Sequence, residues 1–277
     1  MSEPNQALIH RLEEHSRVVR RKAIEMIAAA GSGHPGGALS AVEIVTALYF
    51  YVMRVDPDRP DWDDRDRFVL SKGHGSAALY AALGTRGFFP EEHFLHFRQT
   101  GGLLQGHPCM KRVPGVDMST GSLGQGLSAA LGMALAARCR KKSYHVYVVL
   151  GDGEIQEGQV WEAAMAAAHF RADNLTAILD QNGVQLDGFV SDILSIEPVT
   201  AKWRAFGWRV IECADGHDIS QLLSAFEAAQ QVRGEPAIII ARTVKGKGVS
   251  FMENTAAWHG VSDPSRLADA LEEVRKL

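Results

Sequence analysis

Short apolar runs alternate with longer amphipathic stretches along most of the chain. Strand-like runs occupy residues 67–70, 144–150, 175–179, 208–213 and 237–241. Helix-like spacing of apolar residues is found at 5–30, 39–51, 127–138, 159–170, 200–206, 219–232 and 264–277, whereas 99–120 is rich in loop residues. Repeated strand and helix units predict an α/β fold, with a mostly parallel sheet covered by helices on both faces.

Composition narrows the class of protein. With 277 residues, 46% hydrophobic and 22% charged, and with no internal repeat or linker, the chain is expected to form one large domain, 1–277, with a C-terminal helical tail. A net charge of -4 gives no basic field for nucleic acid, and no apolar run approaches membrane-spanning length or resembles a leader. Cys109, Cys139 and Cys213 show no CxxC spacing, so they are expected to be reduced thiols of a cytoplasmic protein.

Two polar positions follow neighbouring strand-like runs. Gly151-Asp152-Gly153 comes directly after the run 144–150, and Asn182 comes shortly after the run 175–179, with a helix-like segment between them. In one βαβ crossover both positions lie at the carboxyl ends of parallel strands, where open α/β sheets bind ligands. A carboxylate and an amide oxygen suit Mg2+ with a diphosphate completing its shell, and two glycines allow close backbone approach. A bare Gly-Asp-Gly also forms ordinary turns, so the flanking strands and Asn182 decide the interpretation.

Four of the eleven histidines stand next to glycine in predicted loops: His34, His74, His107 and His259. Loop histidines can point into a site, and an imidazole can carry a proton near neutral pH. Taken singly each could be a surface residue, but together with a diphosphate motif they predict a polar active-site cluster. Surface or core roles suffice for the others: His10, His15, His93, His96, His145, His169 and His217.

Eight motifs extend the argument along nearly the whole chain. They are SGHPGG at 32–37, SKGHG at 71–75, GHP at 106–108, STGSLGQG at 119–126, GDGEIQEG at 151–158, DQNGVQLDG at 180–188, KGKG at 245–248 and ENTAAWHG at 253–260. In this order they resemble the transketolase family, which implies the diphosphate-binding domain of a thiamine-diphosphate fold. The family transfers a two-carbon ketol unit from a ketose phosphate to an aldose phosphate, with thiamine diphosphate carrying that unit.

The resemblance assigns roles to individual positions. It implies that Asp152 and Asn182 bind Mg2+ through side chains and Val184 through its carbonyl, and Ca2+ or Mn2+ can substitute. Further cofactor contacts are implied for Gly121, Leu123, Gly153, Lys245, His74 and His259, and Glu157 resembles a glutamate that links cofactor sites across a subunit interface. His34 and His259 are expected to move protons or stabilise an oxyanion, while His74 and His107 position sugar hydroxyls. Leu123 and Val184 could equally be core residues, and Glu157 a carboxylate favoured at a helix start.

The resemblance covers only the first half of a full-length transketolase. The second half, a pyrimidine-binding domain that supplies a cofactor-protonating glutamate and phosphate-binding arginines, has no counterpart before Leu277. The chain is therefore expected to be inactive alone and to need a C-terminal partner subunit, in an α2β2 assembly as the family's dimeric sites imply. The start Met-Ser-Glu-Pro and short tail favour a complete gene product over a truncated enzyme.

Several alternatives stay open. The α chain of a 2-oxo acid dehydrogenase also carries GDG…N, but would lack SGHPGG and SKGHG. Deoxyxylulose-phosphate synthase shares some motifs on a longer chain, and a non-catalytic thiamine-diphosphate-binding module would not need the full set. GSLGQG at 121–126 superficially resembles a dinucleotide fingerprint, but it follows no clear strand. The sugar itself, whether a pentose phosphate, apulose phosphate or a sulfonated fructose, is not determined.

Overall fold

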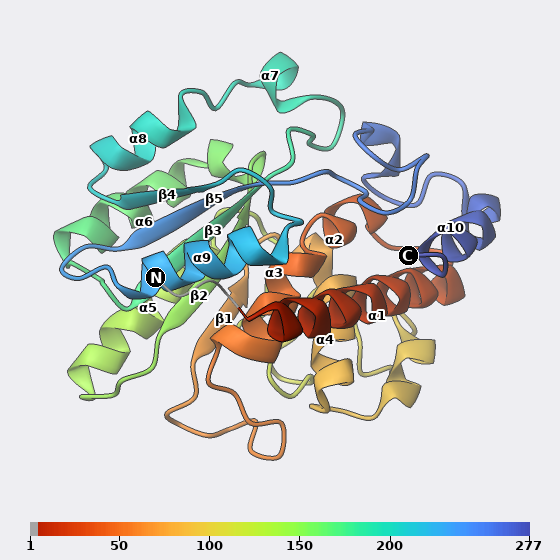
Figure 1. The fold of residues 1–277 in the computed structure, drawn as a ribbon, viewed down its shortest axis with the longest axis horizontal. Coiled ribbons are helices and arrows are strands. Elements are labelled where there is room, and N and C mark those ends of the chain that lie inside the picture. Colours follow the sequence, from red (N-terminus) through yellow and green to blue (C-terminus); the bar gives the residue numbers. More distant parts are fainter. Residues whose placement is uncertain (1–4) are drawn as a thin grey trace.

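One five-stranded parallel sheet organises the molecule (Figure 1). The computed structural model describes residues 5–277, so the Met-Ser-Glu-Pro start lies outside the described residues. The strand order is β1-β2-β3-β5-β4, and every pairing between these strands is parallel. The strands are β1 (Arg67–Leu70), β2 (Val146–Gly151), β3 (Leu175–Gln181), β4 (Arg209–Cys213) and β5 (Ala237–Arg242). The predicted α/β class with a mostly parallel sheet is therefore confirmed.

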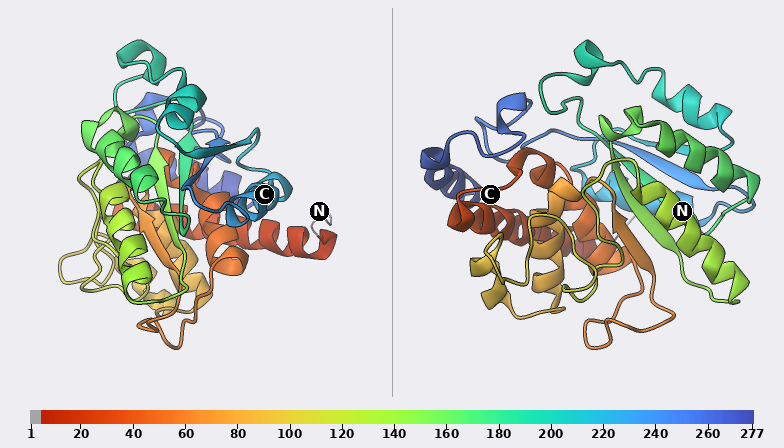
Figure 2. Two further views of the ribbon diagram at one scale, coloured as in Figure 1. Left: turned by 90° about the vertical axis from the view of Figure 1, so that its left-hand side faces the viewer. Right: turned by 180° about the vertical axis from the view of Figure 1, so that it is seen from behind.

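Helices cover both faces of the sheet, as Figure 2 shows when the sheet is seen nearly edge-on. One face packs against α1 (Gln6–Ala30), α3 (Val42–Ala47), α4 (Ser76–Arg86) and α9 (Ile219–Gln230). The other packs against α5 (Gly126–Cys139), α6 (Gly158–His169) and α8 (Val199–Ala205). Side chains of β2 alternate between the two cores, with Tyr147 and Val149 on the first face and Val148 and Leu150 on the second. Both faces are buried at this strand, which explains why its residues are continuously apolar.

Two predicted helices differ from the structure, and two others, α4 and the short α7 (Val190–Ile193), were not predicted. The expected helix 39–51 overlaps the end of α2 (Pro35–Leu39), α3 and a π-type turn at Leu48–Val52, and the chain leaves helical geometry at Ala41, where φ is -98° and ψ is 2°. The hydroxyl of the preceding Ser40 donates to Asp180 Oδ2 at 2.7 Å. Helix α4 was not predicted, since residues 76–84 are buried all round and show no polar face. The tail forms a short turn at Pro264–Arg266 and then α10 (Leu267–Val274), which ends before Leu277.

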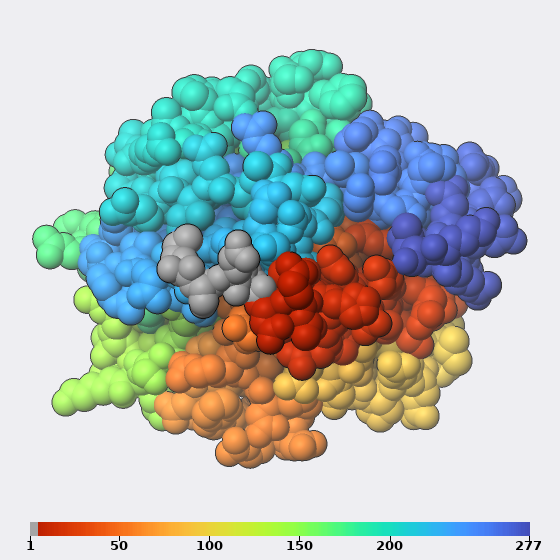
Figure 3. All heavy atoms as spheres, in the orientation of Figure 1, coloured from red at the N-terminus to blue at the C-terminus, as the bar shows by residue number. Residues whose placement is uncertain are grey.

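The tail is part of the core as well as of the surface. Leu267, Ala270 and Val274 of α10 are buried in the same cluster as the apolar side of α1. In the space-filling view, α1 borders this C-terminal segment along the surface (Figure 3). Between residues 5 and 277 no helix combines the length and the apolar character needed to cross a membrane.

Trp203 on α8 provides a test of the packing. Its side chain is fully buried, and its ring lies 5.1 Å from that of Trp161 and 5.0 Å from that of Trp208, centroid to centroid. We expect Trp203→Ala to lower the free energy of unfolding by about 3–5 kcal/mol, because the cavity cannot fully collapse. Urea unfolding measures this, with the exposed Phe170→Ala as control, which should change it by under about 0.5 kcal/mol. Equal effects of the two substitutions would contradict this packing.

Candidate active site

Four of the loops that carry predicted site residues begin at the carboxyl ends of the strands. Strand β1 leads into Ser71, β2 into Asp152, β3 into Asn182 and β5 into the segment that holds Lys245. The register aligns Gly151 with Asp180 and Asp180 with Ala241, so these loops begin at the same level. Parallel strands thus gather polar residues from distant parts of the chain at their carboxyl ends.

Four histidines meet above this edge. The ring centroid of His34 lies 5.7 Å from that of His74, 5.9 Å from that of His107 and 5.6 Å from that of His259. The rings of His74 and His259 are 5.0 Å apart. His34 stands directly before α2, His74 in a 3-10 turn after β1, and His259 directly after the turn Ala256–Trp258. The structure therefore brings together all four histidines singled out by sequence, although their catalytic roles stay predictions.

Glycines of the SGHPGG motif allow this close approach. A Cβ atom on Gly37 would lie 2.7 Å from the ring of His74, and one on Gly36 would lie 2.7 Å from the carbonyl oxygen of Trp258. Neither distance is compatible with a side chain, so both positions require glycine for steric reasons rather than for backbone conformation. The N-terminus of α2 is thereby pressed against the loops that carry His74 and His259.

The histidines are held in the neutral form. Burial, and next the charge of Arg98, lower the pKa of His34 to about 4. Burial, and next the charge of Lys245, lower the pKa of His259 to about 4. Burial also lowers the pKa of His74 and of His107. Neutral imidazoles at pH 7 can accept a proton at one nitrogen and donate a hydrogen bond from the other.

The proposed metal ligands lie side by side at the ends of β2 and β3. Asp152 is 2% exposed, and its carboxylate accepts hydrogen bonds from the N–H groups of Gly153 and Gly183. Burial, and next the negative charge of Asp180, raise the pKa of Asp152 to about 6. Asn182 Oδ1 accepts the Val184 N–H at 3.1 Å, and the Val184 carbonyl accepts Lys245 Nζ at 2.9 Å. Such carboxylate, amide and carbonyl oxygens are the ligands that Mg2+ prefers.

His, Cys, Asp and Glu side chains do not by themselves form a metal site in the described part of the chain. Among residues 5–277 no group of three or more His, Cys, Asp or Glu side chains is arranged to hold a metal ion. The oxygen ligands proposed around Asp152 include only one carboxylate, and the others are an amide and a backbone carbonyl. A bound diphosphate would have to complete the shell of a hard cation there.

Lys245 is a buried cation beside the proposed metal ligands. Its side chain is 2% exposed, and its ammonium contacts the carbonyls of Val184 and Gln185 and, at 3.0 Å, Nδ1 of His259. Burial, and next the charge of Lys72, lower the pKa of Lys245 to about 8. Among the described residues it forms no ion pair with a carboxylate, so an anion such as a diphosphate would relieve the cost of its burial.

The remaining predicted cofactor contacts border the same place. A Cβ on Gly121, where φ is +143°, would lie 3.1 Å from the ring of His107. A Cβ on Gly153 would lie 2.9 Å from Gln185. Leu123 is 37% exposed and is therefore not a core residue, whereas Val184, at 4% exposed, is buried and also presents its carbonyl to Lys245. Glu157 is exposed directly before α6 and makes no capping hydrogen bond.

Unpaired polar atoms favour a bound ligand at this place. His34 Nδ1, Thr120 Oγ1 and Gln185 Nε2 are buried without a hydrogen-bond partner in the described part of the chain. All three belong to segments that border the histidines or the proposed metal ligands. Buried polar atoms in a native protein are normally satisfied, so the pattern fits a cofactor that supplies the partners.

Two buried networks beneath the site were missed from sequence. Lys72 and Asp180 form an ion pair, with Ser40 and Thr243 bonded to the same carboxylate. Glu154 accepts hydrogen bonds from Ser71 Oγ and from the N–H groups of Gly124 and Gly151, at 2.9 Å each for the last two. The available signal was a charged residue directly next to an apolar strand, as at Lys72 and Asp180, because charges at such positions are buried only when paired.

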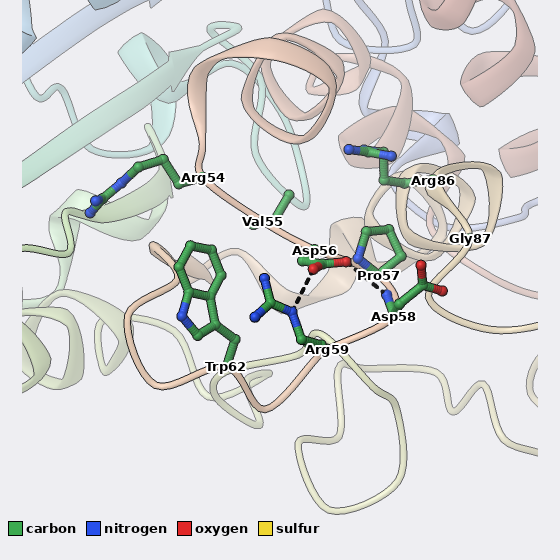
Figure 4. A pocket seen from close by; sticks show the side chains of 9 residues that line it. All are labelled: Arg54, Val55, Asp56, Pro57, Asp58, Arg59, Trp62, Arg86 and Gly87. Carbon is green, nitrogen blue, oxygen red and sulfur yellow. Dashed lines mark hydrogen bonds and ion pairs between the residues drawn. The ribbon is translucent and has the colours of Figure 1, made fainter.

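A cavity lies apart from the candidate active site. Its volume is about 660 Å³, and Figure 4 shows Arg59 and Trp62 facing it. Its lining is Arg54, Val55, Asp56, Pro57, Asp58, Arg59, Trp62, Arg86 and Gly87. Its charges are largely paired within the protein, with Arg59 bound to Asp56 at 2.7 Å and Arg54 bound to Asp66 at 2.9 Å. None of the four clustered histidines lines it.

Low imidazole pKa values make stability depend on pH. In the unfolded chain His34 and His259 titrate near 6.5, but in the folded chain near 4, so only the unfolded state takes up these protons between the two values. We expect the free energy of unfolding of the cofactor-free chain to fall as pH falls through this window. Urea unfolding at several pH values should show a shallower dependence for His34→Gln and no change for the exposed His169→Gln. An unchanged slope in His34→Gln would contradict the low pKa.

Comparison with known proteins identifies the family of this chain. The family model described as "Transketolase, thiamine diphosphate binding domain" matches residues 13–275. A protein of Clostridium sp. (strain MSTE9), named 6-deoxy-6-sulfo-D-fructose transketolase subunit SqwG, is 48% identical over 250 residues, covering 90% of each chain. One of the subunits of the apulose-4-phosphate transketolase of Phocaeicola vulgatus is 42% identical over 267 residues, covering 96% of this chain and 94% of that protein.

A solved structure gives the same result in three dimensions. The transketolase of Campylobacter jejuni superposes with a TM-score of 0.89 at 32% identity, covering 97% of this chain and 42% of that one. The chain thus spans less than half of that enzyme, yet nearly all of the two relatives above. Sequence motifs, family model and fold agree, and the chain belongs to the transketolase family of thiamine-diphosphate-dependent transferases.

Proposed function

We propose that this chain is the diphosphate-binding subunit of a two-subunit transketolase, which moves a two-carbon ketol unit from a ketose phosphate to an aldose phosphate. One observation carries the proposal: three histidines cluster around His34 at the carboxyl ends of the strands, and Lys245 connects His259 to the carbonyl of Val184, next to Asp152 and Asn182. The match to relatives that are themselves named as subunits supports the division into two chains.

Each group in the site has a defined task in this proposal. Asp152, Asn182 and the Val184 carbonyl hold Mg2+, while Gly153 and Lys245 contact the diphosphate. When bound, thiamine diphosphate supplies the carbanion chemistry that activates the donor carbonyl. Gly121 and Leu123 line the channel that admits the cofactor. These ligands fix the cofactor relative to the histidines, which is the main contribution of a protein to cofactor chemistry.

The histidines handle the protons of the sugar. His34 accepts a hydroxyl proton and returns it, and its neutral state at pH 7 leaves a nitrogen free to do so. His259 accepts the Lys245 ammonium at Nδ1, so its neutral ring carries its proton on Nε2 and donates it to the developing oxyanion. His74 and His107 donate or accept hydrogen bonds to neighbouring hydroxyls. The contact between Lys245 Nζ and His259 Nδ1 directs the other nitrogen of His259 toward the substrate.

A second chain completes the site. The single domain 1–277 with its helical tail contributes the diphosphate half, and a pyrimidine-binding partner contributes the other half. In an α2β2 assembly, we assign exposed Glu157 to the link between neighbouring cofactor sites. We assign this assembly to the cytoplasm, with three unpaired cysteines in the described chain.

Donor screening of the two-chain mixture tests the reaction. With the product of the neighbouring gene, thiamine diphosphate and Mg2+, we expect ketol transfer from a ketose that carries an anionic end group, such as xylulose 5-phosphate, and none from pyruvate. Phosphorylated, branched and sulfonated ketoses in the same assay would identify the donor. Turnover of pyruvate in place of every ketose would replace this function with that of a 2-oxo acid enzyme.

A further inference from the structure

The side chain of Arg98 stands at the outer side of the histidine cluster. We propose that Arg98 binds the anionic end group, phosphate or sulfonate, of the sugar whose other end reacts among the histidines. This inference rests on the function proposed above and assigns to this chain, rather than only to its partner, a residue that selects charged sugars.

The backbone brings Arg98 back toward His107. Phe97, 1% exposed, anchors the segment, and Arg98 N–H donates to the Leu104 carbonyl at 2.8 Å. Arg98 has φ of 59°, a left-handed conformation that is uncommon for a residue other than glycine. Such conformations persist only where the surroundings enforce them, and they concentrate at functional sites.

The guanidinium lies directly against the residue before His107. A Cβ on Gly106 would lie 2.6 Å from Nη1 of Arg98 and 3.1 Å from its Cζ. No φ in the left-handed range accounts for glycine at this position. A side chain at this position would therefore have to displace the guanidinium, the flexible end of Arg98.

The charge of Arg98 is not neutralised by the protein. Within residues 5–277 its exposed guanidinium forms no ion pair and donates no hydrogen bond, whereas Arg20 and Arg65 pair with Glu43 and Asp117. Its field lowers the pKa of His34 and of His107, but it is not among the causes for His74 or His259. Arg98 is therefore a free cation on the His34 and His107 side of the cluster.

A cation thus stands at each end of the cluster, buried at one end and exposed at the other. His259 contacts buried Lys245, next to the residues proposed for the metal and the diphosphate, whereas His107 is exposed and neighbours Arg98. A sugar whose carbonyl reacts at the Lys245 end must direct its far carbons past His34 and His107. Its anionic end group then meets a planar guanidinium, which matches phosphate or sulfonate oxygens with paired N–H donors.

Two substitutions test this in the two-chain enzyme. Arg98→Gln removes the charge, and Gly106→Ala keeps it but displaces the flexible guanidinium. For both we expect the KM for xylulose 5-phosphate to rise roughly 10- to 100-fold, as for a lost charge-assisted hydrogen bond. The kcat, and kcat/KM for the uncharged ketose erythrulose, should change less than about 2-fold, within the range of substitutions that remove no specific contact. Arg140→Gln, exposed and paired with Asp63 away from the site, is the control.

The outcomes separate the two proposals. A similar loss with xylulose 5-phosphate and erythrulose would overturn the role of Arg98 and leave the enzyme's reaction intact. A wild-type mixture without activity on either donor would overturn the proposed function.

Phosphate binding to this chain alone tests the proposed role of Arg98 without an activity assay. Inorganic phosphate should shift the NMR signals of the His34 and His107 rings in the wild-type chain, and not in Arg98→Gln. Equal shifts in both, or none in either, would overturn the proposal for Arg98.

Discussion

Replacing Asp152 with alanine is expected to lower the affinity for Mg2+ and thiamine diphosphate by at least about 100-fold, more than the loss of an outer-shell partner causes. The carboxylate is buried and carries no direct ion pair with a lysine or arginine among the described residues, so its charged form is costly until a cation arrives. Without it, Asn182 and one carbonyl would be the chain's only metal ligands in the site.

Isothermal titration calorimetry of the isolated chain, with and without Mg2+, measures the effect. Asp187→Ala is the matched control, because Asp187 is exposed in the loop that follows Asn182. Circular dichroism checks that each variant is folded. Retention of Mg2+-dependent cofactor binding by Asp152→Ala would show that the metal is held elsewhere.

Replacing His259 with alanine is expected to reduce kcat of the two-chain enzyme by about 100- to 10,000-fold, the range for loss of a positioned acid–base group. Its neutral ring lies between Lys245 Nζ and the rings of His34 and His74, so no neighbouring imidazole can take its position without moving. Affinity for Mg2+ and thiamine diphosphate should change far less, because the proposed metal ligands remain.

Steady-state kinetics and cofactor titration of the same preparation separate the two effects. His169→Ala, on the exposed side of α6, should leave both unchanged. Equal loss of cofactor affinity and of turnover in His259→Ala would mean that this histidine holds the cofactor instead of moving protons.

Periodicity and motif order predicted the parts of the fold where one physical signal dominated. The strand runs at 67–70 and 237–241 were placed to within one residue of β1 and β5, because strands buried on both faces are continuously apolar. Helix α4 was missed for the related reason that burial on all sides removes the amphipathic period. Beside the break between α2 and α3, Ser40 donates to Asp180, a contact over 140 residues of sequence that no local pattern contains.

The site also contains residues that the sequence revealed and residues that it did not. Glycine-flanked histidines were found because glycine marks close approach, and the structure explains two of those glycines by the ring of His74 and the carbonyl of Trp258. Lys72, Asp180 and Glu154 were not singled out, since charged residues are ordinarily solvated. Their burial is compensated by partners from distant loops, and only the folded chain brings those partners together.

Arg98 illustrates a third case. No motif included this residue, which stands directly before the loop-rich segment 99–120, and its left-handed backbone and its contact with Gly106 emerge only in three dimensions. The glycine before His107 was part of a recognised motif, but its contact with Arg98 was not evident. A motif therefore predicted the presence of the site, while only the structure shows which side chain lies against this glycine.

Ketol transfer from xylulose 5-phosphate to ribose 5-phosphate, assayed for this chain, for its partner and for their mixture, tests most directly whether this chain is one half of a shared active site. With thiamine diphosphate and Mg2+ present throughout, we expect no turnover from either chain alone. Activity should rise as partner is added and level off at one partner per chain. Turnover by this chain alone would contradict the account, because its own residues would then have to complete the site.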